Sequence, residues 1–230
     1  MEQTSLNLVA IAIFSMVIGV LVLPLLDVSP AVPAIATISV LAVVTFDSFQ
    51  LQGKGGTIAL DWFAGFRSSH RQRVLHHEAG HFLVAYLLEI PITGYTLTAW
   101  EAMRAKQPGF GGVTFDMDNL HRELNQDSRQ IPLVVDQFCS VWMAGIAAEK
   151  LVYGDGEGGA DDRTQIFTTL TALSRSGAEA KLKENFALLQ ATNLIKTNWD
   201  TYNQLVIAME ERKSVAECYQ LLQNQQLQPK

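Results

Sequence analysis

The chain has 230 residues, a formal net charge of −6 and a hydrophobic fraction of 48%. This length accommodates a short membrane anchor and one domain large enough to bury a core. The acidic balance, without a Lys/Arg cluster interleaved with aromatics, argues against nucleic acid as a partner. The two cysteines, Cys139 and Cys218, form no CxxC pair, so neither a disulfide framework nor a cysteine-built zinc site is predicted.

The apolar residues are concentrated at the start of the chain. Residues 6–26 carry no charge and are numerous enough to cross a hydrocarbon core as a helix. A short polar break follows at 27–30, and residues 31–46 are again uncharged, at the short end for a span. We therefore expect a transmembrane helical hairpin over residues 1–46.

Basic residues appear only after this hairpin. Lys54, Arg67, Arg71 and Arg73 follow the second apolar stretch, whereas its other flanks carry no Lys or Arg. The positive-inside rule therefore predicts an integral membrane protein with the later residues on the cytoplasmic side. The glycine-containing stretch 47–69 reads as a linker, and its glycines do not form the phosphate-binding loop GxxxxGK[ST].

The rest of the chain predicts a mainly α-helical domain over residues 70–222 and a Gln-rich tail over 223–230. A small β-hairpin is expected from two segments rich in β-branched and aromatic residues, 94–98 and 112–115. Apolar residues at helical spacing predict helices over 71–88, 131–153, 162–175, 178–198 and 201–222, with a glycine-rich break at 154–159.

The first of these helices contains the sequence His77-Glu78-Ala79-Gly80-His81. Two histidines four positions apart lie on one face of a helix, so His77 and His81 can present two imidazole nitrogens to one zinc ion. Glu78 lies beside that face, where it could act as general base toward a water held by the metal. The pattern predicts a zinc site of the hydrolytic kind. An ordinary helix with two unrelated histidines is the alternative.

A catalytic zinc needs a third protein ligand. Glu101 is one candidate, by analogy with enzymes whose third ligand is a downstream glutamate. The pair Asp161 and Asp162 is favoured, because it stands at a predicted helix start after a glycine loop that lets the backbone approach a metal. A plain Asp N-cap is the alternative role for this pair. The remaining histidines, His70, His76 and His121, are interpreted as non-ligands.

The HEAGH sequence resembles the FtsH family of membrane-bound zinc proteases when taken together with two downstream segments, 144–149 and 153–162, which read AGIAAE and YGDGEGGADD. The resemblance covers roughly residues 70 to 220. It implies an aspartate ligand at a helix start, which falls on Asp162 here, with Asp161 left open because the spacing of the loop differs from the family's.

The resemblance also has a large departure. FtsH enzymes carry an ATPase module between the anchor and the peptidase, where this chain has only the linker 47–69. The chain thus looks like the short FtsH-like proteins of cyanobacteria and plastids, which implies a plasma or thylakoid membrane and, for a plastid protein, a peptidase domain in the stroma.

Together these patterns predict a membrane-anchored zinc metalloendopeptidase that hydrolyses unfolded or membrane-associated polypeptides. Zn2+ is expected at His77, His81 and Asp162, with Glu78 as the catalytic base. A homo-oligomer or an ATPase-bearing FtsH-type partner is plausible by resemblance. The alternative is a catalytically silent FtsH-like membrane subunit that acts as a scaffold or partner of an ATPase-bearing protease or another membrane complex.

Overall fold

The computed structural model describes scattered residues between 14 and 39 and the ranges 68–105, 112–116 and 131–226. The chain divides into two compact units, Met1–Trp62 and Phe63–Lys230. The predicted spans 6–26 and 31–46, like most of the linker 47–69, lie largely outside the described residues.

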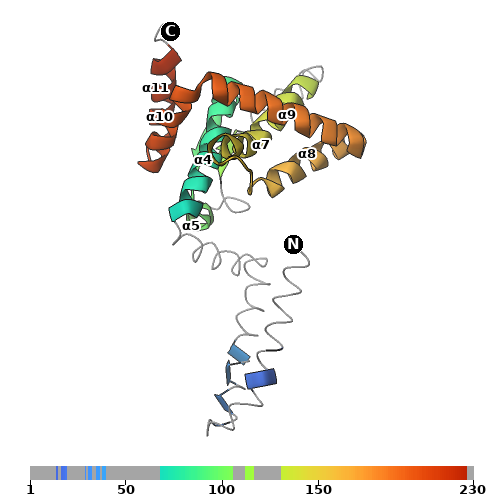
Figure 1. Cartoon of the computed structure of the whole chain (residues 1–230), viewed down its shortest axis with the longest axis vertical. Helices are drawn as coiled ribbons and strands as arrows, with labels where there is room; N and C mark the ends of the chain where they lie inside the picture. Colours follow the sequence, from blue (N-terminus) through green and yellow to red (C-terminus); the bar gives the residue numbers. More distant parts are fainter. Residues whose placement is uncertain are drawn as a thin grey trace. The chain divides into compact units, whose positions relative to one another are not determined.

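The second unit is mainly helical and contains one small sheet (Figure 1). Its elements, in chain order, are α4 (Ser68–Leu87), β1 (Ile92–Tyr95), α5 (Ala99–Arg104), β2 (Val113–Phe115), α7 (Ile131–Tyr153), α8 (Ala160–Ala172), α9 (Gly177–Thr197), α10 (Trp199–Glu210) and α11 (Val215–Gln226). The expected mainly α-helical domain with a small two-stranded antiparallel sheet is confirmed, with α5 standing between the two strands.

Helix α4, which carries HEAGH, packs against α7 at the centre of the unit. Gly80 makes this close approach possible, because a Cβ there would lie 2.5 Å from the Ala144 carbonyl oxygen and 2.8 Å from the Ala148 Cβ. Ala79, next to it, is fully buried. The small residues of the two helices therefore bring the face of α4 that carries His77 up to the surface of α7.

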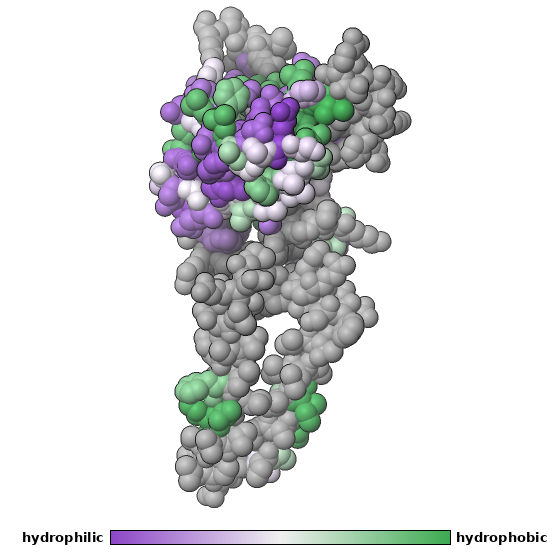
Figure 2. All heavy atoms as spheres, turned by 90° about the vertical axis from the view of Figure 1, so that its right-hand side faces the viewer, coloured by the Kyte–Doolittle hydropathy of each residue, from purple (hydrophilic) through white to green (hydrophobic). Residues whose placement is uncertain are grey.

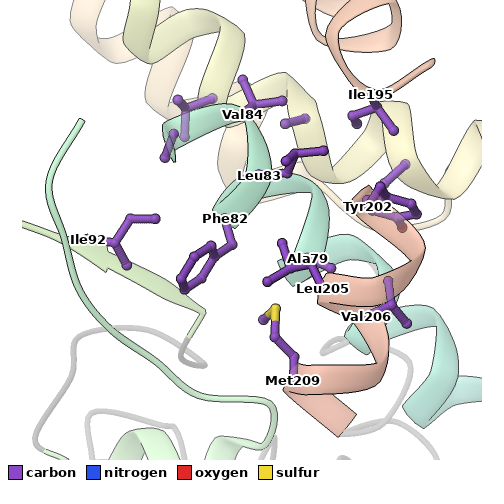
Figure 3. Close-up of a cluster of buried hydrophobic side chains, with 14 of the residues drawn as sticks. Ala79, Phe82, Leu83, Val84, Ile92, Ile195, Tyr202, Leu205, Val206 and Met209 are labelled. Atoms are coloured by element: carbon purple, nitrogen blue, oxygen red, sulfur yellow. The ribbon is translucent and has the colours of Figure 1, made fainter. Parts of the chain in front are cut away.

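The other side of α4 packs against α10 and the sheet. Figure 3 shows Ala79 facing Leu205 and Met209 of α10, with Phe82 directed toward Ile92 of β1. Phe82 is fully buried. Burial of such side chains stabilises the fold by about 1.5–3 kcal/mol each, which holds α4 in place from both sides.

The sheet consists of β1 and β2, which pair antiparallel with Ile92 opposite Phe115 and Tyr95 opposite Val113. The first strand starts earlier and ends earlier than the predicted 94–98. Thr98 belongs instead to the next element: its hydroxyl accepts a hydrogen bond from the Glu101 N–H and caps α5, a helix that the sequence analysis did not predict.

The prediction of a single helix over 201–222 is wrong. The chain forms two helices, α10 and α11, because Arg212 adopts a left-handed conformation (φ 61°) that ends the first. Ser214 and Glu217 then start the second by exchanging hydrogen bonds between each side chain and the other residue's N–H. Helix α11 continues to Gln226, so part of the predicted tail 223–230 is helical; 227–230 lie outside the described residues.

Within the described ranges, α7 is the one helix long and apolar enough to cross a membrane, and 56% of its most apolar window is buried inside the unit. Core helices of soluble domains meet the same criterion. The apolar residues of α7 pack against α4 and α9, so the hydropathy of this helix is explained by its place in the core.

The surface of the unit is mixed. Figure 2 shows hydrophilic side chains over much of one face, with smaller hydrophobic areas among them. Helix α9 contributes exposed apolar side chains at helical spacing, Leu182, Phe186 and Leu189. Its N-terminus is closed by a capping box between Ser176 and Glu179.

Candidate metal centre

Three side chains from two helices converge beside α7. His77 and His81 lie one turn apart on α4, and Asp162, 85 residues after His77, comes from the first turn of α8. The Asp162 Oδ2 atom lies 3.2 Å from His77 Nε2 and 3.6 Å from His81 Nε2. Among the described residues these three form a group whose ligand atoms all lie within 4.8 Å of one another, close enough to hold a metal ion.

The start of α8 explains how Asp162 reaches the histidines. Gly159 is the N-cap residue and adopts a left-handed conformation (φ 81°), which turns the chain into the helix. No side chain caps this helix, so the expected alternative of a plain Asp N-cap is wrong. The Asp162 carboxylate is half-buried and directed toward the two imidazoles.

The other two candidate ligands lie elsewhere. Asp161 is exposed and does not belong to the group. Glu101 is part of the α5 N-terminus, where its carboxylate accepts the Leu97 N–H and pairs with Arg212 at 3.0 Å. The structure thus brings together His77, His81 and Asp162 and separates Glu101 and Asp161 from them.

Glu149 is a site residue that the sequence analysis missed. This glutamate of α7 is 1% exposed, and its Oε1 atom accepts a hydrogen bond of 2.6 Å from His77 Nδ1. A carboxylate only accepts, so the Nδ1 atom carries the hydrogen and Nε2 is directed toward Asp162 and His81. The sequence signal was only a Glu within an otherwise apolar helix, which needs a partner if it is buried.

His81 is oriented in a corresponding way. Its Nδ1–H donates a 2.7 Å hydrogen bond to the Val141 carbonyl oxygen of α7, and the ring is buried. Hydrogen bonds of this kind select the tautomer and ring orientation of metal-binding histidines. Both imidazoles therefore present Nε2 to the same point.

Glu78 stands next to this group without belonging to it. Its Oε2 atom accepts a 3.0 Å hydrogen bond from the Val113 N–H at the start of β2. Gly112 leaves room for the carboxylate, because a Cβ there would lie 3.0 Å from Glu78 Oε2, and its φ of +117° disfavours other residues. The small sheet therefore holds Glu78 beside the three clustered side chains.

Two glycines enclose the His77 ring. A Cβ on Gly145 of α7 would collide with the imidazole, and a Cβ on Gly158 would collide with the Glu149 carboxylate and lie 3.1 Å from His77 Nδ1. A larger residue at either glycine would therefore crowd the ring. The His77 side chain has little freedom to leave its position.

The electrostatics of the group favour charged forms. Burial disfavours a charge on His77, but hydrogen bonds to Asp162 and Glu149 outweigh it and raise its pKa to about 10. Burial also opposes ionisation of Asp162, whereas the neighbouring His81 and His77 hold its pKa well below the usual range. Without a metal the cluster is thus an ion-paired, proton-holding site, and a metal ion would displace those protons.

His70 and His76, the other histidines that the structure describes, do not join the group. His76 lies on another side of α4, where its Nδ1 atom is 2.9 Å from the Tyr202 hydroxyl, and burial lowers its pKa. His70 lies near the start of the same helix, away from the group. His121 falls outside the described residues.

A scan against models of protein families finds no match for this chain, and a search of curated proteins returns no matching sequence.

Proposed function

We propose that this chain is a zinc-dependent metalloendopeptidase of the FtsH-like kind. The observation that carries the proposal is the approach of Asp162 to the two histidines of a HExxH helix, with each histidine held by a separate hydrogen bond. Two unrelated histidines on an ordinary helix would not be expected to contact both a carboxylate from another helix and the buried Glu149.

The residues present fit a catalytic zinc ion. Two imidazoles and one carboxylate form a donor set typical of catalytic zinc, which leaves a position open for water or substrate. Ligand atoms about 2.0–2.1 Å from a tetrahedral zinc lie about 3.3–3.4 Å from one another. The observed separations of 3.2 Å and 3.6 Å from the Asp162 oxygen to the two nitrogens bracket that value.

In this proposal each residue has a separate task. When bound, zinc supplies a Lewis acid that activates water and polarises a peptide carbonyl. Glu78 takes the proton from the attacking water and delivers it to the departing amine. The Val113 N–H holds the Glu78 carboxylate in place by a hydrogen bond. Glu149 and the Val141 carbonyl keep the two imidazoles in place.

The substrates we propose are unfolded or membrane-associated polypeptides. The sequence contains no phosphate-binding loop, so the chain has no recognisable ATP-driven module to unfold a stable substrate. The uncharged stretches 6–26 and 31–46 support a membrane anchor, with the peptidase domain on the cytoplasmic or stromal side. An ATPase-bearing partner would extend the range of substrates.

The test is cleavage of an unfolded protein by the full-length chain in mild detergent, without ATP. We expect cleavage that stops when a zinc chelator is added and resumes when zinc is restored. Cleavage that persists through exhaustive chelation would contradict the proposal, as would absence of stoichiometric zinc in the purified chain.

A further inference from the structure

Arg73 lies one helical turn before His77 on α4 and does not belong to the metal-binding group. Its NH1 atom lies 3.0 Å from Glu149 Oε2 and 2.8 Å from Asp155 Oδ1, and its Nε lies 3.7 Å from Glu157 Oε2. The guanidinium also lies over the Tyr153 ring, 4.5 Å from its centroid. Arg73 therefore joins α4, the end of α7 and the loop that leads to α8.

The buried Glu149 carboxylate divides its two oxygens between different partners. Oε1 faces His77, whereas Oε2 accepts hydrogen bonds from Arg73 and from the N–H groups of Glu157 and Gly158. Two other carboxylates, Glu78 and Asp162, lie close enough to His77 to act on its charge. A buried carboxylate in an acidic surrounding needs a permanent cation, and Arg73 is the one in contact with it among the described residues.

The loop from 154 to 159 depends on the same guanidinium. Asp155 and Glu157 are exposed, yet both approach Arg73, and the chain continues through Gly158 and Gly159 into the first turn of α8, which carries Asp162. Since Asp162 reaches the histidines only through this turn, a displaced loop would move its carboxylate. Arg73 thus acts on the site at two points, through Glu149 on His77 and through the loop on Asp162.

We propose that Arg73 is a positioning residue of the metal centre, which holds the Glu149 carboxylate against His77 and ties down the loop before Asp162. The inference rests on the proposed function, because it assumes that His77, His81 and Asp162 bind zinc. It adds a residue that contacts no ligand atom and that the HExxH pattern does not contain.

Replacing Arg73 by lysine tests whether the positive charge of Arg73 is sufficient or whether the planar shape of the guanidinium is also needed. Both short contacts, to Glu149 and to Asp155, are made by the single NH1 nitrogen. A lysine ammonium can occupy that place as a point charge, although it lacks the planar fork and the stacking on Tyr153. Arg73→Lys should therefore keep most of the zinc affinity that Arg73→Met loses.

The experiment measures the zinc dissociation constant of the full-length chain by competition with a chromophoric chelator. Loss of an outer partner of a metal ligand weakens binding by about 10–100-fold, so we expect about tenfold for Arg73→Met. We expect Arg73→Lys to stay within about threefold of the wild type. Arg212→Met is the matched control, since Arg212 forms a comparable ion pair with Glu101 away from the site.

A double-mutant cycle with Glu149→Gln tests the route of the effect. If Arg73 acts mainly through Glu149, Arg73→Met should cost less than about threefold in zinc affinity once Glu149 is Gln, because only the contribution of the loop remains. Wild-type affinity in Arg73→Met, or an undiminished tenfold loss in the Glu149→Gln background, would overturn the inference. If Arg73→Met does not fold, as judged by circular dichroism, Arg73→Gln takes its place in the cycle. Failure of the wild type to bind zinc would overturn the proposed function itself.

Discussion

The two neighbouring aspartates at the start of α8 allow the ligand assignment to be tested with one atom changed at a time. Asp162 lies 3.2 Å from His77 Nε2, whereas Asp161 is exposed and outside the group. Asp→Asn keeps the size of each side chain and removes its negative charge. Asp162→Asn should therefore weaken zinc binding, and Asp161→Asn should leave it unchanged.

The magnitude follows from the contacts. Removing an outer partner of a ligand costs about 10–100-fold in metal affinity, so removing a charged ligand should exceed about 100-fold, or about 2.7 kcal/mol. Asp161→Asn removes an exposed charge and should change the affinity by less than about twofold.

The assay is chelator competition on the two purified variants and the wild type, with circular dichroism to show that each is folded. The two aspartates are adjacent in sequence, so any general effect on the α8 N-terminus is shared by both variants. Equal zinc affinities for Asp162→Asn and Asp161→Asn, or a greater loss in Asp161→Asn, would refute the ligand set.

Three further changes test the packing and charge around the site. Gly145→Ala places a methyl group against the His77 ring and should weaken zinc binding by at least about tenfold. Gly177→Ala is the control and should leave zinc affinity unchanged, because the nearest side-chain atom to an added Cβ is 3.6 Å away. Equal zinc affinities for the two variants would contradict this packing. Phe82→Ala removes a fully buried ring and should lower the free energy of unfolding by about 3–5 kcal/mol. Phe186→Ala removes a ring that is 57% exposed and should lower it by less than about 0.5 kcal/mol. Similar losses for both variants in chemical denaturation would contradict the core assignment. Burial would raise the pKa of Glu149, but its hydrogen bonds with His77 and Arg73 lower it from 4.5 to about 2, so its contribution to stability is present above pH 4.5 and lost as the pH falls toward 2. In the zinc-free chain the stability difference between wild type and Glu149→Gln should shrink by about 3 kcal/mol over that window, and a difference independent of pH would refute the ion pair.

The helix that carries the two histidines was predictable because its signals are local. Apolar spacing and the HEAGH sequence lie within one segment, and α4 covers Ser68–Leu87 where 71–88 was expected. The approach of Asp162 was anticipated only through the glycine loop before it and the resemblance of that loop to a known family. The structure brings Asp162 to the histidines through the left-handed Gly159.

Two features were missed although the sequence contains a signal for each. Thr98 and Glu101 stand three positions apart at the start of α5, and Ser214 and Glu217 stand three apart at the start of α11. This spacing of hydroxyl and glutamate marks helix N-termini. The position of Glu101 at this N-terminus also makes it a poor ligand candidate, because its carboxylate accepts a hydrogen bond from the Leu97 N–H.

The network behind the ligands could not be derived from the sequence. Glu149 meets His77 across 72 positions and Arg73 across 76, and neither separation follows from periodicity within a helix. The contacts depend on how closely α4 and α7 approach at Gly80 and Gly145. Only the three-dimensional packing shows that a glutamate in an apolar helix contacts His77 of the candidate metal centre.

The most direct test of the central claim compares wild type with Glu78→Gln, which keeps the size of the side chain and its place beside the Val113 N–H. The account predicts that both proteins bind one equivalent of zinc with similar affinity, and that only the wild type cleaves an unfolded protein. Equal cleavage by both would contradict the role of Glu78 as catalytic base. Zinc binding without cleavage by either would contradict the peptidase assignment and favour a silent membrane subunit.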